Sequence, residues 1–256
     1  MSDEGANMGQ IRSYFEGELR RIDYEGLIGV AAFASVHDEL MPVQGQRLME
    51  VCGDNSLNLI ENGSIICIGM AYPEHAIDSI NVVVDGVVDK DRWNLYAGEY
   101  KKINGHLNDI SEKIARRYGG IAIAATLGGL VGKVENVSDY YPLTISHRAV
   151  AENAGLGWRG KNELIVNERY GCAMRFASII TALPLPHGRK IDTKCGSCMA
   201  CLNACPILKG KEKLSDFRES CRRFIKSLTL SDEVCGKCIK SCYRQSIFKG
   251  SFKLRD

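Results

Sequence analysis

The sequence predicts a layered α/β or α+β domain over residues 1–187, followed by a small cysteine-rich module over residues 188–256. Three observations support this division. Segments with helical spacing of apolar residues alternate with short apolar, β-branched segments up to about residue 187. Eight of the eleven cysteines lie between Cys195 and Cys242. Finally, the second part is strongly basic, with sixteen Lys and Arg against seven Asp and Glu, whereas the first part is acidic overall.

Apolar periodicity places the elements of the first part. Residues 10–22 and 91–118 have apolar side chains three or four positions apart, so both segments are predicted helices. The turn-prone pair Asn104-Gly105 lies in the middle of the longer segment, which could therefore form two helices instead of one. A short helix is predicted over 146–154. Predicted strands, indicated by apolar and β-branched residues, cover residues 27–33, 64–70, 80–84, 121–127, 163–167 and 174–183.

The composition is that of a globular protein of the cytoplasm. Hydrophobic residues make up 45% and charged residues 25% of the chain, which are ordinary proportions for soluble proteins. No stretch reaches the 18 or more apolar residues that a membrane span needs, and the polar N-terminal residues do not resemble a secretory signal. In a reducing compartment, clustered cysteines are expected to bind metal rather than to form disulfides. Cys67, within the apolar sequence SIICIGM, is expected to be a buried thiol.

The strongest motif is the cysteine pattern of the second part. The sequence CGSCMACLNACP at 195–206 has C-x2-C-x2-C spacing followed by Cys-Pro, and CGKCIKSC at 235–242 supplies a second set. Such spacing lets three sulfurs face one [4Fe–4S] cluster while the outer cysteine reaches a neighbouring cluster. With Cys221 the ligand count is eight, enough for two clusters. Exchange of the outer cysteines assigns Cys195, Cys198, Cys201 and Cys242 to cluster one, and Cys205, Cys221, Cys235 and Cys238 to cluster two.

Two structural zinc sites are the alternative, because C-x2-C pairs also bind zinc. A three-cysteine loop ending in Cys-Pro is more typical of iron–sulfur proteins, although Tyr243 rather than proline follows Cys242. The module is expected to be mostly loops with one short helix over 215–227, since clusters replace a hydrophobic core. Its positive charge exceeds what two clusters would neutralise. This excess indicates contact with nucleic acid or an acidic electron donor, or simply a solvated basic surface.

A glycine-rich segment, GLGWRGK at 155–161, matches the letters of the dinucleotide-binding motif G-x-G-x-x-G. That motif must follow a strand and open a helix, whereas here a predicted helix precedes it and a predicted strand follows. NAD binding is therefore not expected. Gly155, Gly157 and Gly160 still require a reason, which is either a tight turn or close approach of the backbone to a ligand.

The segment HRAVAENAGLGWRGKN at 147–162 resembles the signature of the epoxyqueuosine reductases and their relatives. The apolar segment ASIITALPL at 177–185 and the eight-cysteine pattern follow in the order found in that family. The resemblance is close from residue 139 to residue 242 and only architectural before that. It implies a nitroreductase-like corrinoid-binding domain over 1–187, shared with reductive dehalogenases, and a ferredoxin-like domain with two [4Fe–4S] clusters over 188–256.

The resemblance also implies an activity. In the tRNA-modifying members, cluster electrons reach a cobalt corrinoid (cobalamin), and the cobalt centre reduces an epoxide on a modified tRNA base in queuosine biosynthesis. The expected partners are therefore tRNA and a low-potential electron donor of the ferredoxin or flavodoxin type. The corrinoid is expected beside the glycine-rich segment, with Gly155 and Gly157 in the turn and with Lys161 and Asn162 near the polar edge of the cofactor.

Reductive C–O cleavage needs an acid that protonates the departing oxygen. The tRNA-modifying members carry an aspartate shortly before the short helix, and an ungapped register places Tyr141 at that position, with Asp139 two residues earlier. Tyr141 is the first choice because a phenol is protonated at neutral pH. Tyr140, Asp139 and His147 are the rival candidates. The alternative is that both tyrosines pack at a domain surface and His147 caps a helix.

Two functions of other classes remain open. The chain could be a ferredoxin-like electron carrier with no substrate of its own, or a flavin-dependent reductase built on the same domain type. Bound corrinoid would indicate the epoxyqueuosine reductase-like function, and bound flavin would indicate the flavoenzyme. Clusters without an organic cofactor would indicate the carrier.

Overall fold

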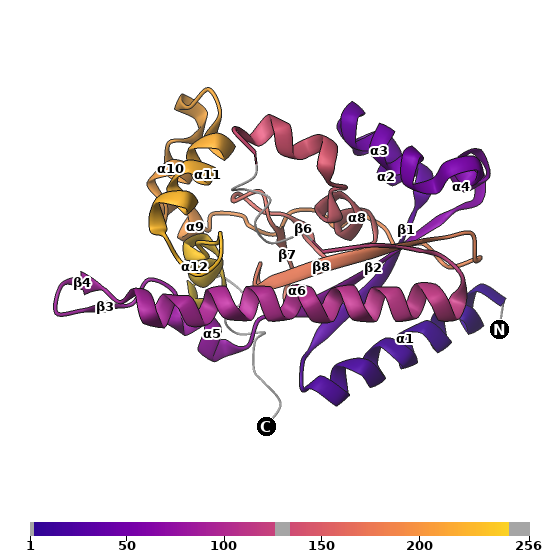
Figure 1. The fold of residues 1–256 in the computed structure, drawn as a ribbon, viewed down its shortest axis with the longest axis horizontal. Helices are drawn as coiled ribbons and strands as arrows, with labels where there is room; N and C mark the ends of the chain where they lie inside the picture. Colours follow the sequence, from indigo (N-terminus) through magenta and orange to yellow (C-terminus); the bar gives the residue numbers. More distant parts are fainter. Residues whose placement is uncertain (1–2, 126–133, 246–256) are drawn as a thin grey trace.

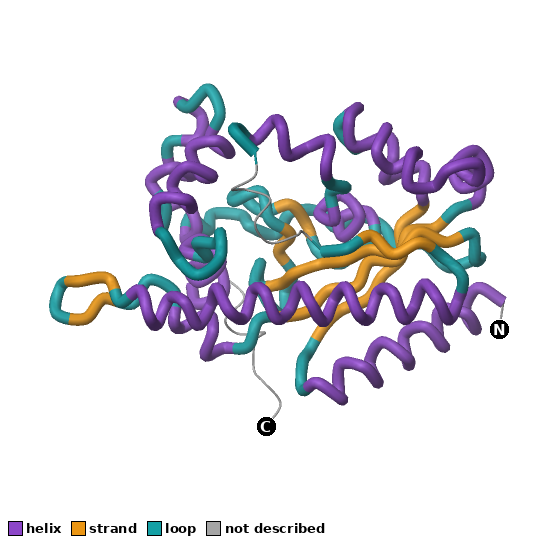
Figure 2. Tube along the Cα trace, viewed as in Figure 1, coloured by secondary structure: helices purple, strands orange, loops and turns teal. Residues whose placement is uncertain are grey.

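The computed structural model describes residues 3–125 and 134–245 (Figure 1). A sheet of four strands lies between two layers of helices, and a group of shorter helices lies at one end of the molecule (Figure 2). All neighbouring strands of the sheet are antiparallel. In spatial order they are β1 (Gly26–Ala32), β2 (Ser64–Ala71), β8 (Met174–Thr181) and β5 (Ile121–Ile123). Within the described ranges, no helix is long and apolar enough to cross a membrane.

Strand β2 is buried along its whole length because helices cover both faces of the sheet. Ile66, Ile68 and Met70 pack against α1 (Asp3–Ile22) and α6 (Lys90–Tyr118). The alternate residues, Cys67 among them, face the second layer. The prediction of Cys67 as a buried thiol is confirmed, since its side chain is fully buried. The second layer contains α2 (Phe33–Glu39), α3 (Pro42–Cys52), η1 (Gly53–Asn55), α4 (Ser56–Asn62) and α8 (His147–Asn153).

The mixed helix and strand composition confirms the predicted α/β or α+β class, and the antiparallel sheet favours α+β. The nitroreductase-like and ferredoxin-like domains stay predictions. The helices predicted over 10–22 and 146–154 correspond to α1 and α8. Three predicted strands, 27–33, 64–70 and 174–183, correspond to β1, β2 and β8. Two others are shorter than expected: 163–167 reduces to β7 (Ile165–Val166), which pairs with β6 (Trp158–Arg159), and 121–127 reduces to β5, with residues 126 and 127 outside the described ranges.

Residues 91–118 form one continuous helix, α6, and the two-helix alternative is wrong. The side chain of Asp89 caps its N-terminus by accepting a hydrogen bond from the backbone N–H of Arg92, 3.0 Å away. Its apolar face is buried along the sheet. Gly105 lies on the opposite, exposed face, where a Cβ atom would meet no other heavy atom within 4 Å. A turn-prone residue pair is tolerated there because packing on the other face fixes the helix.

The buried strand predicted over 80–84 is wrong, because only its last two residues are in a strand and both are exposed. Helix α5 (Glu74–Ser79) ends just before a buried Ile80, and the chain then forms an exposed hairpin of β3 (Val83–Val84) and β4 (Val87–Val88). The turn residues Asp85 and Gly86 both have positive φ angles, as a two-residue hairpin requires. The valines therefore lie on an exposed ribbon instead of a buried strand.

Residues 188–245 contain more helix than expected. The prediction that this part is mostly loops is therefore wrong. The helix over 215–227 is confirmed as α11. The other helices are short, and two of them contain cysteines of the motif, so they lack a clear apolar periodicity. The elements of this part are α9 (Ala200–Asn203), α10 (Pro206–Lys209), η3 (Lys211–Lys213), α11 (Phe217–Leu228) and α12 (Lys237–Gln245). Val234 packs in the same core as β2 and α6, and the boundary near residue 187 stays a prediction.

Replacement of Gly105 by alanine is expected to stabilise the protein by about 0.5–1 kcal/mol, because alanine loses less backbone entropy in a helix interior. Gly26→Ala is the contrasting control, since its Cβ atom would lie 2.2 Å from the carbonyl oxygen of Gly69 in the neighbouring strand. Denaturant unfolding of both variants measures the effect. A loss of stability in Gly105→Ala would show that the helix is interrupted at this residue.

Candidate functional site

The eight clustered cysteines lie in two groups of four. Burial raises the pKa of Cys201 to about 11, and the nearby thiolates of Cys242, Cys195 and Cys198 contribute to the increase. The pKa of Cys221 is likewise raised to about 11, by burial and then by Cys235 and Cys205. The charges that raise the pKa of Cys238 after burial are Cys235, Cys221 and Cys205, followed by Cys201. Group one therefore contains Cys195, Cys198, Cys201 and Cys242, and group two contains Cys205, Cys221, Cys235 and Cys238. This grouping matches the two sets that exchange of the outer cysteines predicts, and their binding of clusters stays a prediction.

Local backbone geometry aims these thiols inward. In both groups a glycine follows the first cysteine of the C-x2-C pair, and Gly196 and Gly236 have φ angles of 46° and 77°. This left-handed conformation favours glycine and reverses the chain; in the first turn Cys198 N–H donates to the Cys195 carbonyl at 2.9 Å. In α12, the two cysteines four residues apart share one helix face.

The donor set fits iron–sulfur clusters. Each group presents four thiols, the ligand number and type of a [4Fe–4S] cluster. Among residues 3–125 and 134–245, no three His, Cys, Asp or Glu side chains are placed to hold a single metal ion. In a cubane each thiolate binds a different iron, so its ligands surround the cluster and do not meet at one ion.

The glycine-rich segment connects the sheet to the loop of group one. Lys161 Nζ donates to the carbonyl oxygens of Gly196 and Cys198 at 2.7 and 2.9 Å. The indole Nε1 of Trp158 donates to Cys195 Sγ at 3.3 Å. Asn162 Nδ2 lies 3.2 Å from the sulfur of Cys172, a buried cysteine that no motif singled out.

The glycines are explained by the chain's own backbone. A Cβ on Gly157 would lie 2.2 Å from the carbonyl oxygen of Val166, and one on Gly155 would lie 2.7 Å from that of Arg189. Gly155 also has a φ angle of 71°. Of the four residues predicted to contact a cofactor, Asn162 alone lines the cavity described next, while Gly155, Gly157 and Lys161 do not. Their role in cofactor binding stays a prediction.

A cavity of about 360 Å³ lies between α6, α11 and the segment of η2 (Val137–Leu143). All four cysteines of group two line it, and none of group one does. Aromatic side chains form much of the wall, and four arginines also line it. The lining includes Tyr96, Tyr100, Tyr140, Tyr141, Phe217, Phe224, Arg148, Arg175, Arg218 and Arg222.

Positive charge is concentrated at this cavity. Burial lowers the pKa of Arg148, and the neighbouring charges of Arg159 and Arg218 lower it further. Arg148 Nη1 donates to the carbonyl oxygen of Glu163 at 2.8 Å. The guanidinium carbon of Arg175 lies 4.5 Å from the ring centre of Tyr100, a cation–π contact. Such a lining favours anionic or electron-rich ligands.

Of the four candidate acids, the structure places the two tyrosines, Tyr140 and Tyr141, at this cavity. The Tyr141 hydroxyl oxygen accepts a hydrogen bond from Arg218 Nη1 at 3.3 Å. Arg218 was not among the predicted site residues, because α11 is far from Tyr141 in the chain and no motif links them. Asp139 is exposed and accepts from the backbone N–H of Asn136 at 3.0 Å, so it caps η2. Its role as an acid, like that of the other three, stays a prediction.

His147 is buried away from this cavity. Its Nε2 lies 2.8 Å from the carbonyl oxygen of Ala124, and its Nδ1 lies 2.8 Å from the hydroxyl of Ser178. Because a carbonyl can only accept, Nε2 carries the proton and Nδ1 accepts from Ser178. Burial lowers the pKa of His147 to about 4, against the opposing effect of the Ala124 carbonyl. This histidine is neutral at pH 7, and both of its nitrogens are hydrogen-bonded within the protein.

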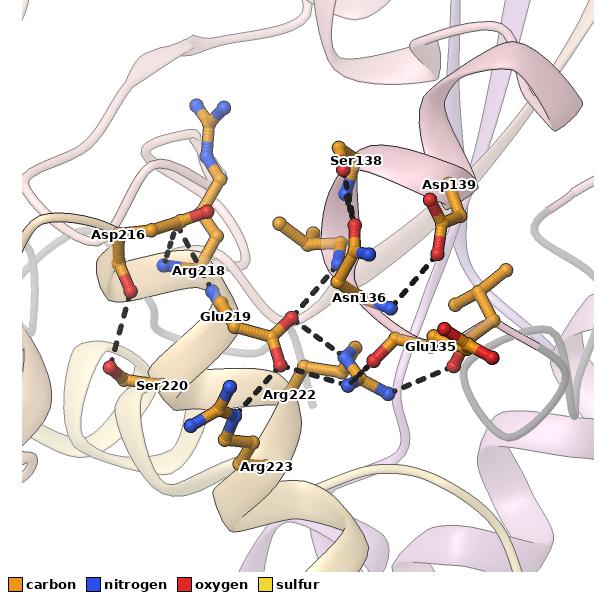
Figure 3. Close-up of polar contacts among 12 residues, drawn as sticks. Glu135, Asn136, Ser138, Asp139, Asp216, Arg218, Glu219, Ser220, Arg222 and Arg223 are labelled. Carbon is orange, nitrogen blue, oxygen red and sulfur yellow. Dashed lines mark hydrogen bonds and ion pairs between the residues drawn. The ribbon is translucent and has the colours of Figure 1, made fainter.

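A polar clamp fixes α11 to the segment that carries Tyr141 (Figure 3). Glu219 accepts from the backbone N–H of Val137 and from Arg222 Nε, both at 2.8 Å. Arg222 also donates to the carbonyl oxygens of Val134 and Glu135. The hydrogen bonds from Arg222, and then those from Arg223 and Val137, hold the pKa of Glu219 at about 2. The helix that contains Cys221 and the segment that contains Tyr141 are thus joined.

Comparison with known proteins supports the resemblance noted in the sequence. No protein-family model matches the chain. The epoxyqueuosine reductase of Lactococcus garvieae is 31% identical over 170 residues, which cover 65% of this chain and 43% of that protein. That of Pseudomonas aeruginosa is 31% identical over 140 residues, covering 54% and 34%, and that of Bacillus anthracis is 42% identical over 62 residues, covering 24% and 16%. The resemblance is confirmed, and the matched residues span less than half of each relative.

Solved structures of epoxyqueuosine reductases are more distantly similar. The Streptococcus thermophilus structure has a TM-score of 0.49 and 20% identity, covering 90% of this chain and 65% of that chain. A structure solved with an epoxyqueuosine-modified tRNA-Tyr stem loop has a TM-score of 0.44 and 21% identity, covering 78% and 52%. Structural likeness at this level does not establish a shared function.

The buried neutral His147 predicts an acid-sensitive stability. Its folded pKa of about 4 lies below the ordinary value of 6.5, so the unfolded chain binds the proton more readily. Its contribution is complete above pH 6.5 and is lost as the pH falls toward 4. Between pH 7 and pH 5 the unfolding free energy of wild type should fall by about 2 kcal/mol more than that of His147→Gln. Denaturant unfolding at both pH values measures this difference. An equal fall of the unfolding free energy in the two proteins would contradict the prediction.

Proposed function

We propose that the chain is an iron–sulfur oxidoreductase of the epoxyqueuosine reductase type, which uses cluster electrons to cleave a C–O bond reductively. The observation that carries this proposal is the cavity itself. The four thiols of group two and the hydroxyl of Tyr141 line the same space. An electron source and a proton source thus meet where a substrate could bind, which is the arrangement that reductive cleavage requires.

The two groups of cysteines hold two [4Fe–4S] clusters in this proposal, and residues 188–256 act as a ferredoxin-like module. Cluster two faces the cavity because its ligands line it. Cluster one, whose ligands do not, accepts electrons from a low-potential donor of the ferredoxin or flavodoxin type. The basic character of this module would attract an acidic donor. Residues of both parts of the chain supply the walls of the cavity in which the substrate would bind.

The organic cofactor of the proposal is a cobalt corrinoid, as the resemblance implies. Aromatic faces and polar groups are suited to a flat macrocycle with amide substituents, and Tyr100, Phe217, Arg175 and Asn162 provide them here. Drug-sized ligands occupy pockets of about 300–1,000 Å³, so a cavity of about 360 Å³ holds only part of a molecule as large as a corrinoid. When bound, the corrinoid supplies an electron-rich metal centre for the reduction.

Tyr141 is the proposed acid. Its hydroxyl is at the cavity wall, and the guanidinium of Arg218 donates a hydrogen bond to its oxygen. A neighbouring positive charge stabilises the phenolate that remains after the proton has left. The clamp between α11 and η2 holds Tyr141 and Arg218 in this relation. Epoxyqueuosine-containing tRNA is the substrate class to test first, because the curated relatives are epoxyqueuosine reductases.

Anaerobic reconstitution should give about eight irons and eight sulfides per chain, since eight thiols each bind one iron. Added cobalamin should then change its absorption spectrum on binding, under anaerobic conditions with intact clusters. Zinc without acid-labile sulfide would contradict the cluster assignment. Intact clusters with bound flavin would indicate the flavoenzyme, and intact clusters without any organic cofactor would indicate an electron carrier.

Tyr141→Phe should lower turnover by roughly 10²–10⁴ while the protein remains folded, because only the proton-donating hydroxyl is removed. Tyr140→Phe is the matched comparison, since Tyr140 is the neighbouring tyrosine on the same cavity wall and a rival acid. Single-turnover assays with intact clusters measure the effect. Full activity in Tyr141→Phe together with loss in Tyr140→Phe, Asp139→Asn or His147→Gln would transfer the role to that rival residue.

A further inference from the structure

Trp158 connects the sheet domain directly to a sulfur of group one. Its indole Nε1 donates to Cys195 Sγ at 3.3 Å, within the range of an N–H···S hydrogen bond. The side chain is 2% exposed. It forms a small core with Val166 and Cys172, against which Cys195 and Cys242 pack. One indole ring therefore touches a ligand sulfur and lies in the same apolar cluster as a second ligand of group one.

A hydrogen bond to a ligand sulfur changes the energetics of cluster reduction. Reduction adds negative charge that is shared with the thiolates, and an N–H dipole aimed at a sulfur stabilises this charge. The effect is larger in a buried, low-dielectric site than in water. A donor to Cys195 therefore raises the reduction potential of the cluster that this cysteine holds.

We propose that Trp158 is a positioning residue that raises the reduction potential of cluster one relative to cluster two. The proposal rests on the cluster ligands assigned under the proposed function. Cluster one is the cluster whose ligands do not line the cavity, so it receives electrons first. A raised potential there lets a donor of modest reducing strength load the module before an electron moves to the cavity.

The chain contains a matched control, because it has only two tryptophans. Trp93 in α6 is also 2% exposed, and its Nε1 also donates to a ligand residue, the Cys235 of group two, at 2.7 Å. Its acceptor is the backbone carbonyl and not the sulfur. The two substitutions Trp158→Phe and Trp93→Phe thus each remove one buried indole N–H beside a cluster, and only the first removes a bond to a ligand sulfur.

The test is a potentiometric titration of the reconstituted full chain, followed by EPR of the reduced clusters. Iron and sulfide analysis first establishes whether both clusters are present. The reduction step that Cys198→Ser alters is assigned to cluster one. Trp158→Phe should shift this step to a more negative potential and leave the other step unchanged. Trp93→Phe should leave the potential of cluster one unchanged.

Unchanged potentials in Trp158→Phe with full iron and sulfide would overturn the role of Trp158 while the proposed function survives. Absence of clusters in wild type would overturn both. If Trp158→Phe fails to assemble clusters, Trp93→Phe labelled with ¹⁵N-tryptophan keeps a single labelled indole. Pulsed EPR of its reduced cluster one should then detect a ¹⁵N coupling, and its absence would refute the hydrogen bond to the cluster.

Discussion

Bringing eight thiols into two compact groups is the requirement on which the rest of this structure depends. Burial and the proximity of other thiolates both oppose ionisation, as the raised pKa values of Cys201 and Cys221 show. If the groups bind clusters as proposed, iron replaces the protons and couples ligand assembly to folding. In the absence of metal, the groups must be held by contacts with the rest of the protein. Lys161 holds the loop of group one, and Trp93 and Lys240 attach group two and α12 to α6 and α5.

Helix α6 organises the molecule because one continuous element reaches group two, the cavity and the central sheet. Its first turn contains Trp93, which binds the carbonyl of Cys235. One turn further on, Tyr96 and Tyr100 form a wall of the cavity. Asn104 then accepts from Arg175 on the central sheet at 3.0 Å. A rigid helix of 29 residues thus fixes the distance between the sheet and the cysteines of group two; a chain broken at residue 104 would leave that distance variable.

The sequence was informative where chemistry or periodicity is local. Cysteine spacing predicted which thiols would lie together, because short loops restrict which sulfurs can meet, and the strict apolar period of 91–118 predicted α6. It failed at residues 80–84, where β-branched residues form an exposed ribbon, and in the second part, where short helices contain cysteines of the motif. For the glycine-rich segment the sequence left two explanations, a tight turn or close approach of the backbone to a ligand. The structure shows that the carbonyls of Val166 and Arg189 leave no room for a Cβ atom at Gly157 and Gly155. Contacts such as Arg218 with Tyr141 depend on tertiary structure and leave no local pattern.

The clamp between α11 and η2 links the cysteines of group two to the position of the candidate acid. Glu219 and Arg222 lie within one helical turn of Cys221 and hold the backbone beside Tyr141. If Cys221 binds cluster two as proposed, a chain that lacks this cluster loses an anchor of α11 and, through the clamp, the alignment of its acid. Oxidative damage to the cluster would then abolish proton transfer and electron transfer together. The protein would fail as a unit, without a half-active form that could consume reductant or trap substrate.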